Sequence, residues 1–266
     1  MKRVVVCGGC GKMASIAATL INNDKSLQLI GIVESEAHPN CGRDWGEIMG
    51  KGKSGIIVGC DLVKIINQCD VVVDFTNPEA SMVHLDICEI AKKAMVIGTT
   101  GFSDNQIDKI HKLAQSIPIV LSPNMALGIN LLFELVRKVS SILDESYDIE
   151  IIETHHRYKK DAPSGTAKKI AEIIAKEKGT KLEERAVYGR SGIIGSRKEG
   201  EIGIHAVRAG NINGEHTIIF NSLGERIELT HKAYGREAFA EGTLKAIHFI
   251  SNKDRGIYSM KEVLNL

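Results

Sequence analysis

Short apolar strands alternate with helical segments throughout the first half of the chain. Runs rich in valine and isoleucine have the length and composition of buried strands. We expect strands at Arg3–Cys7, Leu27–Val33, Cys69–Asp74, Ala94–Gly98 and Ile117–Leu121, and helices at Met13–Ile21, Pro78–Lys93 and Ser103–Gln115. Because repeated strand–helix units bring successive strands parallel, the sequence predicts an α/β fold with a doubly wound, mostly parallel sheet.

A glycine-rich turn follows the first expected strand and opens the first expected helix. Gly9-Cys10-Gly11-Lys12-Met13-Ala14 fits the pattern G-x-G-x-x-G/A. Glycines here permit a tight turn and let a pyrophosphate approach the backbone, while the helix N-terminus offers N–H groups to its phosphates. Glu34 ends the second expected strand about 20 residues later, where a ribose-binding acid belongs. We therefore predict a Rossmann-like dinucleotide site, the alternative being a purely structural turn.

The choice between NAD and NADP depends on the residues around Glu34. A carboxylate accepts hydrogen bonds from a free ribose 2′-OH and repels a 2′-phosphate. The next residue is Ser35, which carries no positive charge, and Lys12 is the nearest candidate counter-charge. These residues favour NAD and leave NADP open.

Later turns at the carboxyl ends of the strands complete the predicted cofactor site. Phe75-Thr76-Asn77, Gly98–Gly101 and Ser122–Met125 each follow an expected strand, and the alternative for each is an ordinary β-α turn. The predicted cofactor-binding residues are Gly8, Gly9, Cys10, Gly11, Lys12, Met13, Glu34, Phe75, Gly98, Thr99, Thr100, Ser122, Pro123, Asn124 and Met125.

The second half of the chain has a different organisation. A strand is expected at Tyr147–Glu153, and Asn213-Gly214 and Leu223-Gly224 separate three later strands as hairpin turns would. The other expected elements are helices at Leu127–Leu143 and Arg236–Ile250 and strands at Glu201–Arg208, His216–Asn221 and Arg226–His231. They predict a second α+β domain on a mixed sheet. The predicted domains are residues 1–126 plus 236–266, which bind the dinucleotide, and residues 127–235, which bind the substrate.

A cationic segment in the second domain runs directly into a helix start. Ser164, Gly165 and Thr166 precede an apolar stripe, so their hydroxyl and N–H groups lie at a positive helix end that suits a carboxylate. The alternatives are a plain helix cap and a solvated basic face. His155 and His156 can face one ligand only if the strand ends or bends there, and we expect that it does, because the apolar alternation stops after Glu153. The upstream cations are His155, His156, Arg157, Lys159 and Lys160.

Charge and cysteine usage exclude several classes of protein. The 34 basic and 33 acidic residues form no long run of one sign, and no apolar run is long enough to cross a bilayer. The balanced charge argues against a protein that binds nucleic acid or a membrane surface. Glycines interrupt the apolar N-terminal segment, so we expect a cytoplasmic protein. Cys7-Gly-Gly-Cys10 permits a redox or zinc interpretation, but we favour one strand thiol and one loop thiol, and no metal.

The segment Glu153-Thr-His-His-Arg-Tyr-Lys-Lys-Asp-Ala-Pro-Ser-Gly-Thr166 resembles the signature of the 4-hydroxy-tetrahydrodipicolinate (dihydrodipicolinate) reductase family. The resemblance covers nearly the whole chain. It extends to Gly8–Met13, Asp74–Thr76, Gly98–Phe102, Asn124, Gly128, Asn130, Val207–Gly210 and Gly214–Thr217. It implies NAD(P)H-dependent reduction of (2S,4S)-4-hydroxy-2,3,4,5-tetrahydrodipicolinate, a cyclic dicarboxylate, to (S)-2,3,4,5-tetrahydrodipicolinate with loss of water, in lysine and diaminopimelate biosynthesis.

The same resemblance implies roles for individual residues. His155 would donate and accept a proton, Lys159 would be a second proton donor, and His156 would bind the substrate together with Gly165 and Thr166, beside Ser164. Family members are usually homotetramers joined through the second domain. Members that use NADP often carry an arginine where this chain has Ser35, so the choice between NADH and NADPH stays open.

Two questions remain open at this point. The residues do not separate an acid role for Lys159 from a counter-charge role. The alternatives to the reductase are another two-domain nicotinamide-dependent dehydrogenase of amino-acid metabolism and a non-catalytic dinucleotide-sensing protein. The remaining histidines are expected to be structural or on the surface, and they are His38, His84, His111, His205, His216, His231 and His248.

Overall fold

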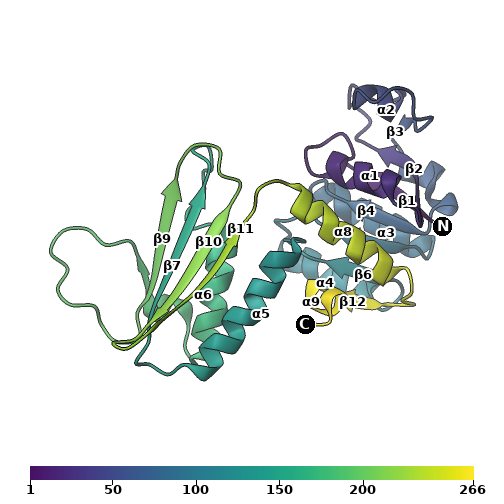
Figure 1. The fold of residues 1–266 in the computed structure, drawn as a ribbon. Coiled ribbons are helices and arrows are strands. Elements are labelled where there is room, and N and C mark those ends of the chain that lie inside the picture. The colour runs from purple at the N-terminus through teal and green to yellow at the C-terminus, as the bar shows by residue number, and fades with distance from the viewer. The chain divides into compact units, whose positions relative to one another are not determined.

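The computed structural model describes all 266 residues as two compact units. Unit 1 comprises Met1–Leu127 and Arg236–Leu266, and unit 2 comprises Gly128–Gly235. Unit 1 therefore contains both ends of the chain, which appear in purple and yellow in Figure 1. None of the helices is both long and apolar enough to span a membrane.

Unit 1 is built on a seven-stranded parallel sheet in the order β12-β6-β5-β4-β1-β2-β3. The strands are β1 (Lys2–Cys7), β2 (Leu27–Val33), β3 (Val58–Gly59), β4 (Val71–Asp74), β5 (Ala94–Ile97), β6 (Pro118–Leu121) and β12 (Gly256–Tyr258). The helices are α1 (Ala14–Asn23), α2 (Trp45–Ile48), η1 (Leu62–Lys64), η2 (Ile66–Gln68), α3 (Pro78–Ile90), α4 (Asp104–Leu113), α8 (Glu237–Ile250) and α9 (Met260–Leu264). The predicted doubly wound parallel sheet is confirmed.

Alternation along β1 divides the core of unit 1 between the two faces of the sheet. Val4 and Val6 pack in one buried cluster with residues of α1 and α8, whereas Val5 and Cys7 pack in the other with residues of α3 and α4. Figure 1 shows α8 beside α1, so the C-terminal segment completes the layer that the first helix begins.

Local sequence sets where the helices of unit 1 start. Asn77 accepts a hydrogen bond from the backbone N–H of Ala80, and Pro78 occupies the first turn of α3, where its missing N–H costs nothing. Ser103 and Gln106 form a capping box at the start of α4. These starts leave the turns after β4 and β5 short.

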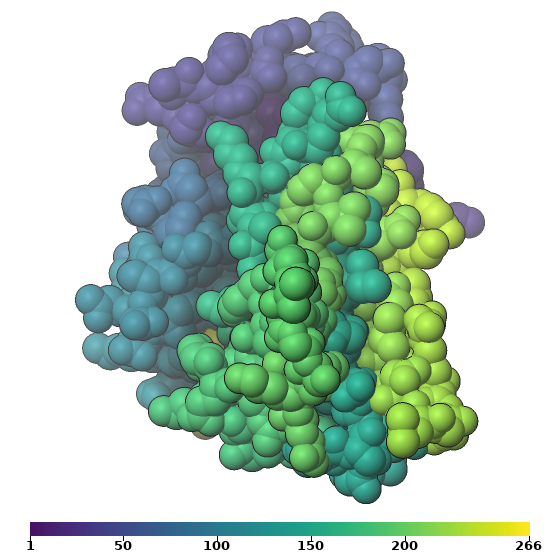
Figure 2. Space-filling view, turned by 90° about the vertical axis from the view of Figure 1, so that its left-hand side faces the viewer, coloured from purple at the N-terminus to yellow at the C-terminus, as the bar shows by residue number.

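Unit 2 contains a five-stranded mixed sheet in the order β11-β10-β7-β9-β8, as the predicted mixed sheet requires. Its elements are α5 (Leu127–Ile142), β7 (Asp148–His155), α6 (Gly165–Glu177), α7 (Leu182–Arg185), β8 (Ala186–Tyr188), β9 (Ile202–Arg208), β10 (Glu215–Asn221) and β11 (Arg226–Lys232). Figure 1 shows α5 and α6 on one face of this sheet. A long, largely exposed loop, residues 189–201, precedes β9 and lies toward the viewer in Figure 2.

One predicted hairpin of unit 2 is confirmed and the other is wrong. β10 and β11 pair antiparallel across Leu223-Gly224. β9 and β10, which flank Asn213-Gly214, do not pair, because β7 lies between them, parallel to β9 and antiparallel to β10. The connection from β7 to β9 contains helix α6 and allows β9 to lie parallel to β7. Because β9 occupies one side of β7, β10 pairs with the other side.

The expected strand end lies between the two adjacent histidines, but the predicted bound at Glu153 is too early. β7 continues to His155, with Glu153 and His155 both buried on the face that carries Ile149 and Ile151. The expectation rested on the loss of apolar alternation, but the period-2 alternation of burial continues with polar side chains. His156 is the first residue beyond the strand.

Candidate active site

Three turns at the carboxyl ends of the parallel strands touch one another in unit 1. Gly8, after β1, has φ +79°, and a Cβ there would lie 2.8 Å from the carbonyl oxygen of Phe75, after β4. A Cβ at Gly98, after β5, would lie 2.1 Å from the Phe75 ring. Glycine is required at both positions, since any side chain would push these turns apart.

Glu34 lies beside the glycine turn, as the dinucleotide pattern predicts. Its Oε1 accepts a hydrogen bond of 2.7 Å from the backbone N–H of Cys10. The indole of Trp45 supports the other side of the turn and donates a 3.2 Å hydrogen bond to the carbonyl of Gly9. The residues present therefore fit a dinucleotide: glycines leave the backbone accessible before α1, and a carboxylate stands where a ribose would be bound.

The remaining predicted cofactor residues lie at the same edge of the sheet. In the turn after β6, the Ser122 hydroxyl donates 2.8 Å to the carbonyl of Asn124, whose side-chain oxygen accepts from the N–H of Ala126 at 3.0 Å. Met125 is buried, whereas Lys12, Thr100 and Pro123 are exposed. Parallel strands place these turns together because all their carboxyl ends meet at one edge.

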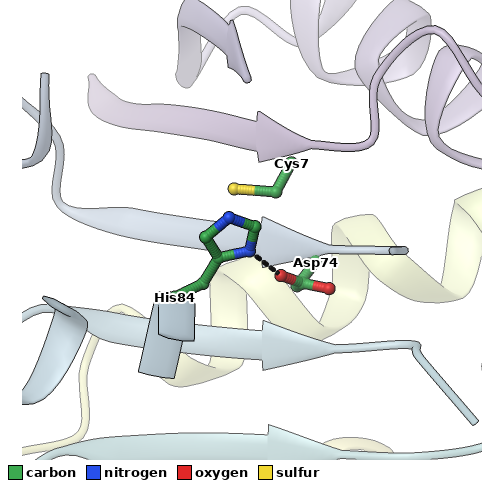
Figure 3. A group of neighbouring side chains, drawn as sticks. All are labelled: Cys7, Asp74 and His84. Carbon is green, nitrogen blue, oxygen red and sulfur yellow. Dashed lines mark hydrogen bonds and ion pairs between the residues drawn. The ribbon is translucent and has the colours of Figure 1, made fainter. Parts of the chain in front are cut away.

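The two thiols of Cys7-x-x-Cys10 do not converge. Cys7 is fully buried in the core cluster on one face of the sheet, and Cys10 packs against the cluster on the other face. Each has its own polar neighbours, which are Asp74 and His84 for Cys7 (Figure 3) and Glu34 and His38 for Cys10. The pair thus offers neither a disulfide nor a common metal site, in agreement with one strand thiol and one loop thiol.

In unit 2 a buried carboxylate connects the cationic segment to the rest of the sheet. Glu153 is fully buried, and its Oε2 accepts a 2.5 Å hydrogen bond from Nδ1 of His155. Arg208, on β9, donates to both oxygens of Glu153, at 2.8 and 2.7 Å. The N–H of Ser164 donates to Oε1 at 3.1 Å, so Glu153 fixes both His155 and the start of α6.

Burial and neighbouring charges set the protonation of this cluster. Burial raises the pKa of Glu153, but hydrogen bonds from Arg208, His155 and Ser164 lower it further, so the carboxyl is ionised. Burial lowers the pKa of His155, and the attraction of Glu153 does not reverse that shift. Arg208 already compensates the Glu153 charge, which explains why burial dominates.

The residues of the predicted anion site lie together at the start of α6. Ser164 caps the helix by accepting a 3.2 Å hydrogen bond from the N–H of Ala167, and a Cβ at Gly165 would meet open space. Thr166 is half-buried beside them. In the preceding loop Lys159 pairs with Asp161 at 2.9 Å, and Nδ1 of His156 is buried without a hydrogen-bond partner.

Two family models together match almost the whole chain. The model described as "Dihydrodipicolinate reductase, N-terminus" matches residues 2–125, and "Dihydrodipicolinate reductase, C-terminus" matches residues 128–264. The chain belongs to the dihydrodipicolinate reductase family. This membership confirms the resemblance that the signature segment carries.

Individual relatives resemble this dihydrodipicolinate reductase family member along their full length. The "4-hydroxy-tetrahydrodipicolinate reductase" of Syntrophus aciditrophicus (strain SB) is 47% identical over 264 residues, covering 99% of this chain and 98% of the relative. That of Polynucleobacter necessarius subsp. necessarius (strain STIR1) is 41% identical, covering 99% of each. The solved structure of dipicolinate-bound dihydrodipicolinate reductase from Paenisporosarcina sp. TG-14 matches with a TM-score of 0.80 and 26% identity over 98% of each chain.

Sequence reasoning missed three residues of the unit 2 site in this family member. The sequence predicts Glu153 as the end of a strand and the first residue of the signature segment, gives Arg208 no role, and predicts His216 to be structural or on the surface. The signal for Glu153 was its period-2 relation to His155. Arg208 and His216 lie in segments that carry the family resemblance, but nothing local assigns them a role, because their partners are on other strands.

His216 lies directly behind the candidate acid. Its ring meets that of His155 edge-on, with centroids 5.3 Å apart, and its Nε2 lies 3.2 Å from the hydroxyl of Ser164. Burial, aided by the positive charge of protonated His155, lowers the pKa of His216 from 6.5 to about 4. It is therefore a neutral partner of the helix cap.

The lowered pKa of His216 predicts a loss of stability in acid. Between the unfolded pKa of 6.5 and the folded pKa of about 4, the unfolded chain binds more protons at this histidine. The free energy of unfolding should therefore decrease as the pH is lowered through that window. The expected loss between about pH 7.5 and about pH 5 is about 2 kcal/mol. Urea unfolding at about pH 7.5 and pH 5 tests this, with His216→Gln expected to lose that part of the pH dependence. Exposed His111→Gln is the control and should keep it, and an unchanged slope in His216→Gln would contradict the prediction.

Proposed function

We infer that this chain is a 4-hydroxy-tetrahydrodipicolinate reductase, an NAD(P)H-dependent oxidoreductase of lysine and diaminopimelate biosynthesis. Family membership over nearly the full length supports the activity. The observation that carries the chemistry is the Glu153–His155 pair beside the capped start of α6. It combines a proton-transfer group with an anion site, which reduction of a cyclic dicarboxylate requires.

Unit 2 binds the substrate in this proposal. The start of α6, with Ser164, Gly165 and Thr166, binds one carboxylate through hydroxyl and N–H groups at a positive helix end. His156 and Lys159 add donors from the neighbouring loop, and charge-assisted contacts of this kind fix the orientation of the ring. The TG-14 protein was solved with dipicolinate, a planar dicarboxylate of the same class.

His155 is the proposed proton donor. The nicotinamide cofactor supplies a hydride to the substrate ring, which must also gain a proton. Nδ1 of His155 is engaged by Glu153, so Nε2 is the nitrogen that exchanges the proton. A Cβ at Gly214 would lie 3.1 Å from Nε2, so glycine at 214 leaves this nitrogen accessible.

Unit 1 binds the cofactor in this proposal, through the turns after β1, β4, β5 and β6 and through Glu34. Contacts among Gly8, Phe75 and Gly98 support this assignment because they shape one continuous edge. Glu34 suits a free ribose 2′-OH, so we expect NADH to bind more tightly than NADPH.

The open face of the unit 2 sheet suits a homotetramer. Side chains on the face opposite the helices, including Ile152 and Ile219, are only partly buried, and Val207 is 42% exposed. Sedimentation in solution tests this part of the proposal, and a mass of one 29.0 kDa chain would overturn it.

Turnover of freshly made (2S,4S)-4-hydroxy-2,3,4,5-tetrahydrodipicolinate tests the function and the cofactor together. We expect oxidation of NADH to depend on the substrate and NADPH to be used less efficiently. Glu34→Gln should lower the ratio of kcat/KM for NADH to kcat/KM for NADPH by about tenfold, because it removes the charge that repels a 2′-phosphate. Glu36→Gln is the matched control two residues away. Absence of turnover with either cofactor would overturn the reductase assignment, and equal preference in the parent protein would overturn the role of Glu34.

A further inference from the structure

A fully buried carboxylate lies beneath the turns of unit 1. Asp74, the last residue of β4, is 0% exposed. Its Oδ1 accepts hydrogen bonds from the Thr76 N–H at 3.1 Å, from the Thr76 hydroxyl at 2.7 Å and from the Thr99 hydroxyl at 2.9 Å. The hydroxyl of Ser81, on α3, donates to the same oxygen at 2.7 Å. One oxygen thus connects the turn after β4, the turn after β5 and the start of α3.

The second oxygen of Asp74 has a partner of its own. Nδ1 of His84, on α3, lies 2.6 Å from Oδ2, as Figure 3 shows. Burial raises the pKa of Asp74, but hydrogen bonds from His84, Ser81 and Thr76 lower it further, so the group is ionised. Cys7, beside the pair, is neutral because burial and the Asp74 charge raise its pKa.

Both oxygens of Asp74 thus have hydrogen-bond partners inside the protein. The two turns are also joined directly, because the N–H of Thr76 donates 3.0 Å to the hydroxyl of Thr99. Phe75 lies between the bonded residues Asp74 and Thr76, and its ring contacts Gly98. The conformation of both turns therefore depends on one buried anion that His84 holds from the opposite side.

We propose that the Asp74–His84 pair is a positioning device that holds the turns after β4 and β5 in the shape that binds the cofactor. This inference rests on the proposed function, in which Phe75, Thr99 and Thr100 contact the dinucleotide. His84 is a positioning residue, since it reaches the site only through Asp74. Its removal leaves Oδ2 buried without a donor, and the turns rearrange to solvate it.

The test compares NADH binding by His84 variants in the absence of substrate. His84→Ala should raise the NADH Kd about tenfold, the change expected when a buried group loses its hydrogen-bond partner. His84→Asn can place an N–H close to the position of Nδ1 and should stay within about threefold of the parent. His111→Ala, an exposed histidine on α4, is the control and should bind NADH as the parent does. Fluorescence titration gives the Kd values, and thermal unfolding shows that each variant is folded at the titration temperature.

The outcomes separate positioning from a merely structural role. A folded His84→Ala that binds NADH within twofold of the parent overturns the proposal, and so does His84→Asn that binds as weakly as His84→Ala. If His84→Ala does not fold, Ser81→Ala takes its place: a raised Kd supports the proposal and an unchanged Kd overturns it. At saturating NADH, kcat of the variants should match the parent, because only cofactor binding is affected. Failure of the parent to bind NADH would instead overturn the cofactor assignment itself.

Discussion

Replacing His155 by glutamine is expected to lower kcat by about 10²- to 10⁴-fold, the usual contribution of a positioned proton donor. Glutamine has a similar reach and can still donate to Glu153, but it cannot release a proton at the position of Nε2. The Kd for NADH should stay unchanged, because His155 belongs to unit 2 and the proposed cofactor turns belong to unit 1. Steady-state kinetics at saturating substrate and NADH titration measure the two quantities.

Variants of Lys159 sharpen the same experiment. Lys159→Arg keeps the positive charge, but a guanidinium does not release its proton near neutral pH. If Lys159 is a proton donor, this variant should be nearly as slow as Lys159→Met, whereas a counter-charge should tolerate arginine. His111→Gln is the histidine control and should keep parental kcat. Parental kcat in His155→Gln would contradict the role assigned to His155.

Replacing Glu153 by leucine is expected to lower both stability and activity. The substitution leaves the Arg208 guanidinium without its counter-charge in a largely buried site, with a cost of about 3 kcal/mol in the free energy of unfolding. It also removes the acceptor for Nδ1 of His155 and for the N–H of Ser164. Urea unfolding measures the first effect, and kcat, which should fall by about 10²-fold or more, measures the second.

The double variant Glu153→Leu/Arg208→Leu separates these two effects. Removing both charges should recover much of the lost stability, because an apolar pair of similar size is often as stable as a buried ion pair. Activity should not recover, since His155 still lacks its orienting acceptor. If Glu153→Leu is destabilised by less than about 1 kcal/mol, the expected cost of leaving Arg208 without its counter-charge is contradicted.

The parallel sheet of unit 1 was predictable because its signals are local. β2 has the predicted bounds Leu27–Val33, and α4 begins directly after Ser103, where the sequence predicts its helix to start. Strand composition, a glycine turn and caps each occupy a few consecutive residues, and the handedness of β-α-β connections then limits the topology. The turns of the candidate cofactor site follow, since parallel strands all end at the same edge.

The sheet of unit 2 was less predictable because its order depends on long connections. Turn dipeptides indicated two hairpins, and only Leu223-Gly224 joins paired strands. The central position of β7 results from the crossover to β9, which no local pattern records. The extension of β7 to His155 was missed for a related reason, since buried polar residues replace the apolar alternation there.

The sequence by itself determined the class of fold, the glycine turn and the presence of a cationic segment before a helix, since each depends on neighbours in the chain. Only the tertiary structure decided which side chains share a proton or a charge. Glu153 meets Arg208 across two paired strands, and Asp74 meets His84 between a strand and a helix. Such buried polar groups are stable only when distant partners satisfy them, so their identity depends on the packed fold.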